Sequence, residues 1–264
     1  MVTRPRWRRI VALAASSSLL ASLAVGVPLS AQADTAPATP STPTTVSSDS
    51  LPTAQVDGVV WSQIIVGNTV YVGGEFTQAQ PAGAAAGVGA VTRTDMLAYN
   101  LTTGDLLPFA PTFNAQVRGL AASPDGRTIY AVGNFTQVNG INRYRVVALD
   151  AVTGAVRTAF TAQTNAAVYT VAATATTVYL GGTFTIADNV ARTRAAAVDA
   201  TTGALTGWAP QIPDHRVQAM VLSPDGSKIV LGGSFLSLNG STSPGRGLGA
   251  GDPVSGATQP WNAG

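Results

Sequence analysis

The chain has 264 residues, of which 45% are hydrophobic and only 11% are charged. This composition predicts one or two folded domains with a packed core and excludes a chain that is disordered throughout. There is no cysteine and His215 is the single histidine, which excludes disulfides, thiolate metal sites and multi-histidine metal sites. We predict no metal site and no cofactor.

The basic residues are unevenly placed along the chain. Four arginines fall within the first nine residues, and all 13 acidic residues lie at Asp34 or later. Without residues 1–33, 11 of the 15 basic residues remain against 13 acidic ones, which is a net charge of −2. A basic surface for nucleic acid is therefore not supported, and no nucleic-acid partner is predicted.

The N-terminal segment has the order of a secretory signal peptide. Residues 1–9 are arginine-rich, residues 10–29 are apolar and uncharged, and Ala31-Gln32-Ala33 is a small-x-small cleavage site. A membrane anchor is the alternative, because the apolar stretch is long enough to be ambiguous. The cleavage site and the polar sequence beyond it favour removal, and no later segment approaches a membrane span. We expect an exported protein, secreted or at the cell surface.

Residues 34–54 form the next segment and are rich in Pro, Thr, Ser and Ala. They show no period and lack the apolar surface needed to fold, which predicts a flexible linker. The folded part is therefore predicted to span residues 55–264.

Four copies of one pattern follow the linker. The clearest copy is TIYAVGNFT at residues 128–136, and its counterparts lie at residues 69–77, 177–185 and 228–236. Their phenylalanines, at positions 76, 135, 184 and 235, are separated by 59, 49 and 51 residues. A fixed period in this range indicates a repeat architecture.

In the second repeat, an alternating first segment and three further short segments between tight turns predict four antiparallel strands. These strands cover residues 117–123, 128–135, 144–150 and 155–161. Pro124-Asp125-Gly126 supplies the first turn, and residues 137–142 are predicted to be a polar loop.

The third strand of each repeat ends in the same kind of turn. Asp or Asn stands at its end and Gly follows four residues later, at the pairs 100/104, 150/154, 199/203 and 252/256. A large aromatic residue comes next, at positions 109, 160, 208 and 261. An Asp side chain caps the backbone two residues on, and Gly accepts the left-handed conformation. Because a reaction centre is normally unique, this repetition favours a turn role for the aspartates over a catalytic one.

Stacked four-stranded repeats of about fifty residues predict an all-β protein, a β-propeller with four-stranded antiparallel blades around a central channel. The predicted blades are residues 55–112, 115–164, 166–213 and 215–264. The Gly-Gly pair is expected to let adjacent blades approach closely, and the following Phe to fill the gap between them. A β-sandwich is the alternative, but four homologous repeats would be unusual in one. The chain has either four blades in a ring or belongs to a larger propeller, and we favour the larger one with further blades or domains.

At residues 70–77, at the Ser-Pro-Asp-Gly turns 123–126 and 223–226, and at the Asp-x-x-Thr-Gly turns, the sequence resembles the delta-60 repeat family of secreted actinobacterial β-propellers. The resemblance covers the chain from about residue 56 to its end. It implies a secreted propeller, and similar proteins often carry further repeats and immunoglobulin-like or carbohydrate-binding modules. The family has no general catalytic residue set, so no catalytic residue is assigned.

A second resemblance concerns residues 197–203 and Trp208, which look like the tryptophan-docking repeat of quinoprotein dehydrogenases. Those enzymes hold pyrroloquinoline quinone with calcium in an eight-bladed propeller. This chain has half the blades, no cysteine and no identifiable carboxylate cluster for the metal. A shared way of packing blades explains the likeness better than a shared activity does.

Arginines near the third strand are candidates for a ligand-binding ring on the loop face, since guanidinium forks match carboxylates and sulfates. They are Arg93, Arg143, Arg145, Arg192, Arg194 and Arg246. The alternative, which we favour, is that they bond loop carbonyls within or between blades.

Only two candidates are specific to one blade, Glu75 and His215. An exposed carboxylate and a loop histidine are the simpler interpretations, and no partner for a catalytic triad is marked out. We predict a non-catalytic binding or scaffold module for a protein or glycan. The alternative is an enzyme, a hydrolase, lyase or quinoprotein-like dehydrogenase, with blade-specific polar groups converging on the channel.

Overall fold

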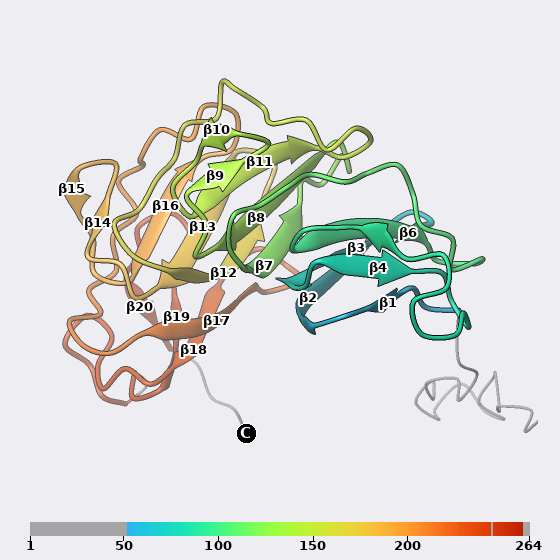
Figure 1. The fold of residues 1–264 in the computed structure, drawn as a ribbon. Helices are drawn as coiled ribbons and strands as arrows, with labels where there is room; N and C mark the ends of the chain where they lie inside the picture. The colour runs from blue at the N-terminus through green and yellow to red at the C-terminus, as the bar shows by residue number, and fades with distance from the viewer. Residues whose placement is uncertain (1–51, 244, 261–264) are drawn as a thin grey trace, which may run out of the picture. The chain divides into compact units, whose positions relative to one another are not determined.

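The computed structural model describes residues 52–243 and 245–260 of the chain. Contacts divide the chain into two units, residues 1–50 and 51–264, and the described residues belong to the second unit. Their regular structure is entirely β-strand, in successive antiparallel sheets (Figure 1). The predicted signal peptide and most of the predicted linker lie outside the described residues.

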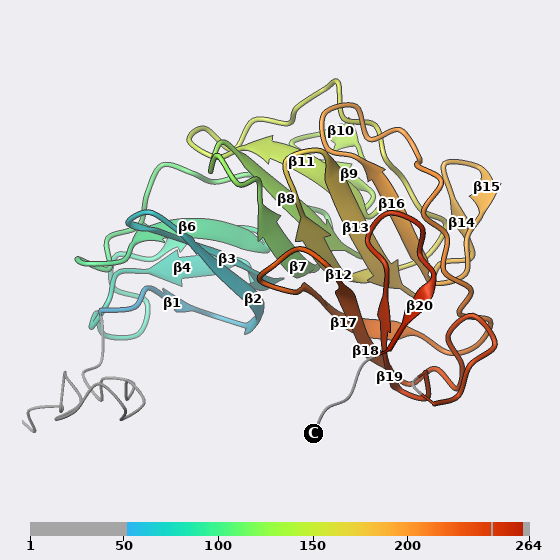
Figure 2. The same cartoon turned by 180° about the vertical axis from the view of Figure 1, so that it is seen from behind.

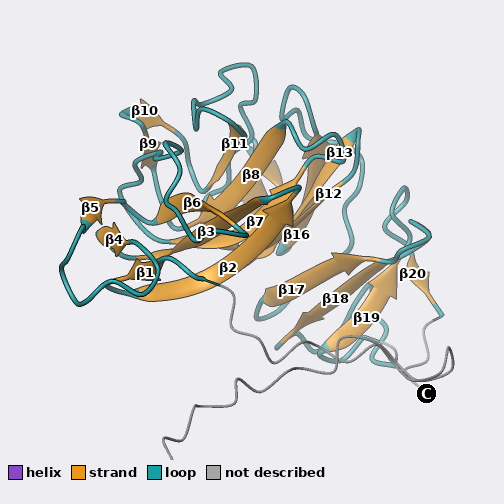
Figure 3. Cartoon of the chain, turned by 90° about the vertical axis from the view of Figure 1, so that its right-hand side faces the viewer, coloured by secondary structure: helices purple, strands orange, loops and turns teal. Residues whose placement is uncertain are grey.

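Four sheets follow one another along the chain, one for each repeat, as the blades of a β-propeller (Figure 3). The first holds β2 (Val59–Val66), β3 (Thr69–Glu75) and β6 (Met96–Asn100). The second holds β7 (Val117–Ala122), β8 (Thr128–Gly133) and β11 (Val146–Asp150). The third holds β12 (Val168–Ala173), β13 (Thr177–Gly182) and β16 (Ala195–Asp199). The fourth holds β17 (Val217–Leu222), β18 (Ile229–Gly233), β19 (Leu248–Gly251) and β20 (Thr258–Gln259).

The innermost strands β2, β7, β12 and β17 lie next to one another in space, in the same order as in the chain (Figure 2). The second strand of each of the first three blades packs against the innermost strand of the next, as β3 does on β7 and β13 on β17. Three apolar clusters fill the spaces between consecutive blades, and a fourth lies on the outer side of the first blade. The core is thus divided among the blade junctions, as expected for stacked repeats.

The fourth strand is short in every blade. In the first three blades its place is taken by one isolated bridge, at Tyr99–Leu106, Leu149–Val156 and Val198–Leu205. In the fourth blade it is the two-residue strand β20. The chain leaves the ladder early because the aromatic residue that follows is drawn between the blades, where Phe160 packs on Tyr130 with ring centroids 5.6 Å apart.

Residues 137–142 differ from the predicted polar loop. They form a hairpin of β9 (Gln137–Val138) and β10 (Ile141–Asn142), turned at Asn139-Gly140, whose φ values are +51° and +75°. Two successive positive φ values are typical of the tight turns that join short antiparallel strands. The third repeat has the same feature in β14 (Ile186–Ala187) and β15 (Val190–Ala191). In the first repeat, β4 (Gln78–Gln80) pairs with β5 (Val91–Thr92) and with β1 (Gln55–Val56).

The Asp-x-x-Thr-Gly turns form as predicted. Asp150 Oδ1 accepts hydrogen bonds from the amides of Val152 and Thr153, at 3.1 and 3.0 Å, and Gly154 has a φ of +73°. Equivalent bonds are made by Asp199 and Asp252. These bonds stabilise the ionised carboxylates and lower the pKa of all three aspartates.

A tyrosine on the second strand ties each of the first three blades to the next one. Its hydroxyl donates to a backbone carbonyl in the turn of the following blade, 2.8 Å away in each case. The pairs are Tyr71 with Ala151, Tyr130 with Ala200 and Tyr179 with Pro253. The fourth blade has Val230 at this position and cannot make such a bond.

Candidate ligand-binding site

The innermost strand of every blade contains a β-bulge at the same position. Its pairing with the second strand skips one residue, which is Trp61 in β2, Arg118 in β7, Tyr169 in β12 and Gln218 in β17. A bulge leaves the extra residue out of the ladder, bends the strand and redirects the side chain. The four bulged residues occupy one structural position, but their side chains differ in chemistry.

The glycine that is the second residue of each Gly-Gly or Val-Gly pair permits this bulge. A Cβ added to Gly133 would overlap the carbonyl oxygen of Gln116, the second residue before the bulged Arg118. The equivalent overlaps occur at Gly74, Gly182 and Gly233 with the carbonyls of Val59, Ala167 and Arg216. Glycine at this position thus lets the innermost strand come close enough to form the bulge, which is a role that the sequence did not suggest.

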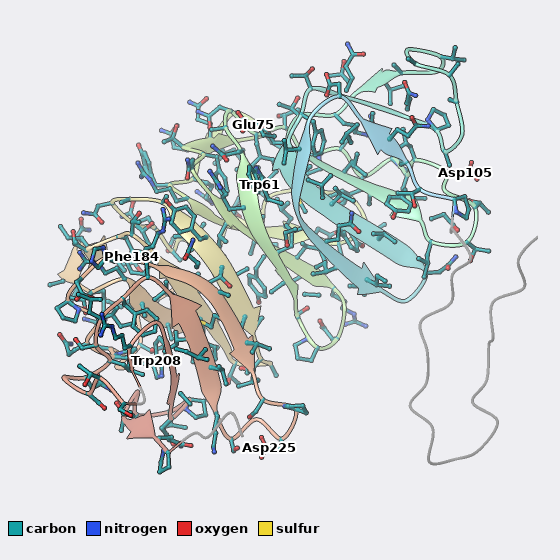
Figure 4. The ribbon with its side chains drawn as sticks, turned by 90° about the horizontal axis from the view of Figure 1, so that it is seen from below. Trp61, Glu75, Asp105, Phe184, Trp208 and Asp225 are labelled. Atoms are coloured by element: carbon teal, nitrogen blue, oxygen red, sulfur yellow. The ribbon has the colours of Figure 1, made fainter. Side chains whose placement is uncertain are left out.

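The four bulged residues and Arg216 line one cavity of about 350 Å³. Trp61 stands on the first blade beside the strands of the second (Figure 4). Trp61 is 46% exposed and Arg216 is exposed, whereas Arg118 and Tyr169 are half-buried. The lining therefore combines two aromatic rings, two guanidinium groups and one amide, contributed by all four blades.

Aromatic and cationic side chains alternate along this cavity. The guanidinium carbon of Arg118 lies 4.5 Å from the ring centroid of Trp61 and 5.5 Å from that of Tyr169. Arg216 continues the row, with its guanidinium carbon 5.9 Å from the same tyrosine ring. These are cation–π distances, so the rings hold the guanidinium planes in place. We call Trp61, Arg118, Tyr169 and Arg216 the aromatic–arginine row.

The two guanidinium groups of the row retain hydrogen-bonding capacity. Neither side chain forms a hydrogen bond or an ion pair with residues 52–243 or 245–260, where Arg157–Asp150 is the one salt bridge. The Nε of Arg118 is buried without a partner. No carboxylate of residues 52–243 or 245–260 lines the cavity. The arrangement therefore suits an anion, because a stacked guanidinium still offers its N–H edge to carboxylate, sulfate or phosphate oxygens.

The predicted ring of arginines lies elsewhere. Arg93, Arg143 and Arg192 each donate from Nη1 to the carbonyl of the preceding residue, at 2.8 to 2.9 Å. Their Nη2 groups donate to the carbonyls of Leu107, Thr158 and Thr206. These bonds match the alternative in which the arginines brace loops, and a ligand-binding role for them stays a prediction.

The remaining predicted arginines differ from one another. Arg145 Nη1 donates to the carbonyl of Thr164 at 3.0 Å, and Arg194 Nε donates to that of His215 at 2.9 Å. Both carbonyls lie in the connection that leads to the next blade. Arg246 is exposed in the loop before β19, and its side chain has no hydrogen bond to the described residues.

Glu75 and His215 are not brought together. Glu75 is exposed at the end of β3 and lines a cavity of about 550 Å³ with Asp57 and Asp95, between the first two blades. Burial raises the pKa of Asp95, while hydrogen bonds from Thr77 and Gln78 lower that of Asp57. His215 is exposed just before β17 with a φ of +49°. Within the described residues no group of three or more His, Asp or Glu could hold a metal ion.

Sequence reasoning missed the aromatic–arginine row because each member belongs to a different repeat. A signal was present in the aligned repeats, where a valine is followed by a changing residue. The pairs are Val60-Trp61, Val117-Arg118, Val168-Tyr169 and Val217-Gln218. A fixed apolar residue beside a variable large one marks a position that the fold does not constrain.

No protein-family model and no curated protein matches the sequence. Among solved structures, the chain is similar to hydrazine synthase of Kuenenia stuttgartiensis, with 13% identity, a TM-score of 0.49, and coverage of 78% of this chain and 49% of that one. It is also similar to the β-propeller domain of Cps50 (Swd1) of Myceliophteria thermophila, with 12% identity, a TM-score of 0.49, and coverage of 79% and 56%. A third is the computationally designed Ika4 protein, with 15% identity, a TM-score of 0.47, and coverage of 77% and 95%.

The chain thus spans about half the length of the first two of these proteins. The propeller fold is assigned from the repeated sheets and their stacking. None of the described residues belongs to a helix that is long and apolar enough to cross a membrane.

Proposed function

We propose that this protein is an exported β-propeller module that binds acidic glycans through the aromatic–arginine row. The observation that carries the proposal is the convergence of Trp61, Arg118, Tyr169 and Arg216 on one cavity without a carboxylate among them. Export is supported by the order of the N-terminal segment, and a delta-60 type of propeller by the repeat motifs.

The chemistry of the cavity favours an acidic sugar polymer. Guanidinium forks pair with uronate carboxylates or sulfate esters, and the exposed ring of Trp61 offers an apolar surface for a sugar face. Gln218 adds an amide that both donates and accepts, as hydroxyl groups require. Among the described residues, the lining offers no carboxylate or histidine for proton transfer, which disfavours acid–base catalysis here.

The test is a titration of the secreted protein with polygalacturonate, heparin and neutral dextran, followed by calorimetry. We expect binding to one or both acidic polymers and none to dextran. Arg118→Gln should weaken binding by about tenfold or more, because charge-assisted hydrogen bonds contribute about 1.5–3 kcal/mol. Trp61→Ala should weaken it as well, since Arg118 then loses the ring that orients it.

Arg246→Gln is the matched control. It removes the same charge from an exposed arginine outside the cavity, and it belongs to the ring predicted from the sequence. We expect its affinity to stay within about twofold of the unmodified protein, as for an exposed charge that contributes only to long-range attraction. Equal losses in the two arginine variants, or no binding to either acidic polymer, would contradict the proposal.

A further inference from the structure

The residue directly before the third strand is charged in each of the first three blades, but the sign of its charge differs. It is Asp95 in the first blade, Arg145 in the second and Arg194 in the third. The three residues share one backbone conformation, with φ values of +64°, +70° and +65°. Each donates its amide to the carbonyl of the repeated phenylalanine, as Asp95 does to Phe76 at 3.0 Å. The three side chains therefore leave equivalent points of their blades.

In the second and third blades, the arginine reaches the connection that leads to the next blade. Arg145 Nη1 donates to the carbonyl of Thr164 at 3.0 Å, and Arg194 Nη1 donates to that of Ile212 at 3.4 Å. These two acceptors are equivalent, because each directly follows the residue whose amide is bound by the side chain at the hairpin turn after the second strand. By the same bond, the equivalent residue in the first connection is Phe113.

The junction between the first and second blades has a cavity at this place. Asp95 and Phe113 both line it, and its volume is about 550 Å³. Asp95 cannot replace the arginine bond to the carbonyl of Phe113, because an ionised carboxylate only accepts hydrogen bonds. No arginine, lysine or histidine of the described residues lines the cavity. The first junction therefore lacks the guanidinium group that the later two junctions contain.

Two further residues of this cavity are acidic where the next two blades have neutral residues. Asp57 corresponds to Asn114 and Asn165, since all three accept a hydrogen bond from the amide of the threonine after the repeated phenylalanine. Glu75 directly follows the Gly-Gly pair, where the next two blades have an asparagine and a threonine. Together with Asp95, these positions carry three negative charges in the first blade and one positive charge in the second.

Asp95 is the buried member of this set, with 7% of its surface exposed. Its Oδ1 accepts a hydrogen bond from the amide of Phe76 at 3.1 Å, whereas Oδ2 has no partner among residues 52–243 and 245–260. Burial raises the pKa of Asp95, and the charge of Glu75 raises it as well. A cation in the cavity would pair with the free oxygen and offset both effects. Because the described carboxylates form no group that could hold a metal ion, an organic cation suits the cavity better.

We propose that the cavity between the first and second blades binds a guanidinium group of another molecule, in the place that Arg145 and Arg194 fill at the later junctions. Oδ2 of Asp95 and the carbonyl of Phe113 accept its N–H groups, and Glu75 adds attraction from an exposed position. The ligand is an arginine side chain of a partner protein or a small guanidinium compound, which share this chemistry. The site is separate from the aromatic–arginine row, whose arginines attract anions.

NMR titration of the ¹⁵N-labelled protein at neutral pH tests the proposal. The ligands are acetyl-arginine amide and acetyl-citrulline amide, which has nearly the same shape but no charge. We expect only the arginine compound to shift the amide resonances of Phe76 and Asp95. A third ligand, one arginine within a glycine–serine peptide, distinguishes the two sources. Tighter binding of the peptide would support a partner protein, and equal binding would support a small compound.

Asp95→Arg gives the first blade the residue that the next two blades carry. Its guanidinium should bond to the carbonyl of Phe113, so affinity for the arginine compound should fall by about tenfold or more. The urea concentration at half-unfolding should stay the same or rise, because an interblade bond is gained. Asp95→Asn is a second variant, since it removes the charge but keeps an acceptor for the amide of Phe76. It should also weaken binding, and it tests the site even if Asp95→Arg does not fold.

Two controls separate this site from other charges. Asp105→Asn removes an exposed carboxylate outside the cavity, and Arg118→Gln removes a charge from the aromatic–arginine row. Both variants should bind the arginine compound like the unmodified protein, so failure of glycan binding and failure of this site are distinguishable. Equal shifts with the citrulline compound, no shifts with any ligand, or undiminished binding by the folded Asp95 variants would overturn the proposal.

Discussion

One tyrosine hydroxyl forms a hydrogen bond across each junction between neighbouring blades. The hydroxyl of Tyr130 donates to the carbonyl of Ala200 at 2.8 Å in a buried position. Tyr130→Phe keeps the ring but leaves that carbonyl unpaired, so the free energy of unfolding should fall by about 1 kcal/mol. Urea unfolding measures this. Tyr144→Phe, at a 42% exposed tyrosine, should change stability little, and equal losses in both variants would contradict the role of the interblade bond.

Acid sensitivity also arises at single residues. Hydrogen bonds from the hydroxyl of Ser223 and from the amide and hydroxyl of Ser227 lower the pKa of Asp225 to about 2, from 3.8. Because the folded-state pKa is the lower one, ionised Asp225 stabilises the fold above pH 3.8, and this stabilisation is lost as the pH falls toward about 2.

Asp225→Asn should therefore lose stability at neutral pH and show a smaller further loss between about pH 4 and pH 2 than the unmodified chain. Urea unfolding at several pH values is the measurement. Asp105→Asn is the control, since this exposed carboxylate accepts no hydrogen bond from the described residues. An unchanged pH profile for Asp225→Asn would show that the turn does not depend on the charge.

At the scale of the element, the bulge depends on the glycine behind it. Gly133→Ala would place a methyl group on the carbonyl of Gln116, so β7 must move and Arg118 with it. We expect a loss of about 1–3 kcal/mol in unfolding free energy, as for other overpacked sites, together with weaker glycan binding. Gly207→Ala is the control, because a Cβ there meets nothing within 4 Å. Equal stability of the two variants would contradict this account.

The sequence predicted those elements whose cause is local. An Asp side chain and a left-handed glycine determine the turn at residues 150–154 by themselves, and the alternation of residues 117–123 predicted β7. The hairpin of β9 and β10 was missed, since two residues on either side of Asn139-Gly140 are too few to show alternation. The fourth strands were predicted too long, because Phe160 packs between blades and takes the chain out of its ladder.

At the scale of the whole molecule, the repeats predicted the propeller, but they could not predict the site. Repetition drew attention to residues that recur, such as the aspartates of the turns and the arginines that brace loops. The aromatic–arginine row consists of residues that do not recur. Only the stacking of blades brings the guanidinium carbon of Arg118 to 4.5 Å from the ring centroid of Trp61. A site of this kind follows from the geometry of the array and has no motif of its own.

The bulge also affects how such a molecule can diversify. Its extra residue lies outside the ladder, so an exchange of that side chain leaves the pairing of the sheet and the cores between blades unchanged. The chain already shows this, with Trp, Arg, Tyr and Gln at one position of four copies of the same scaffold. The side chains that line the cavity can therefore change one blade at a time without conflict with selection for folding.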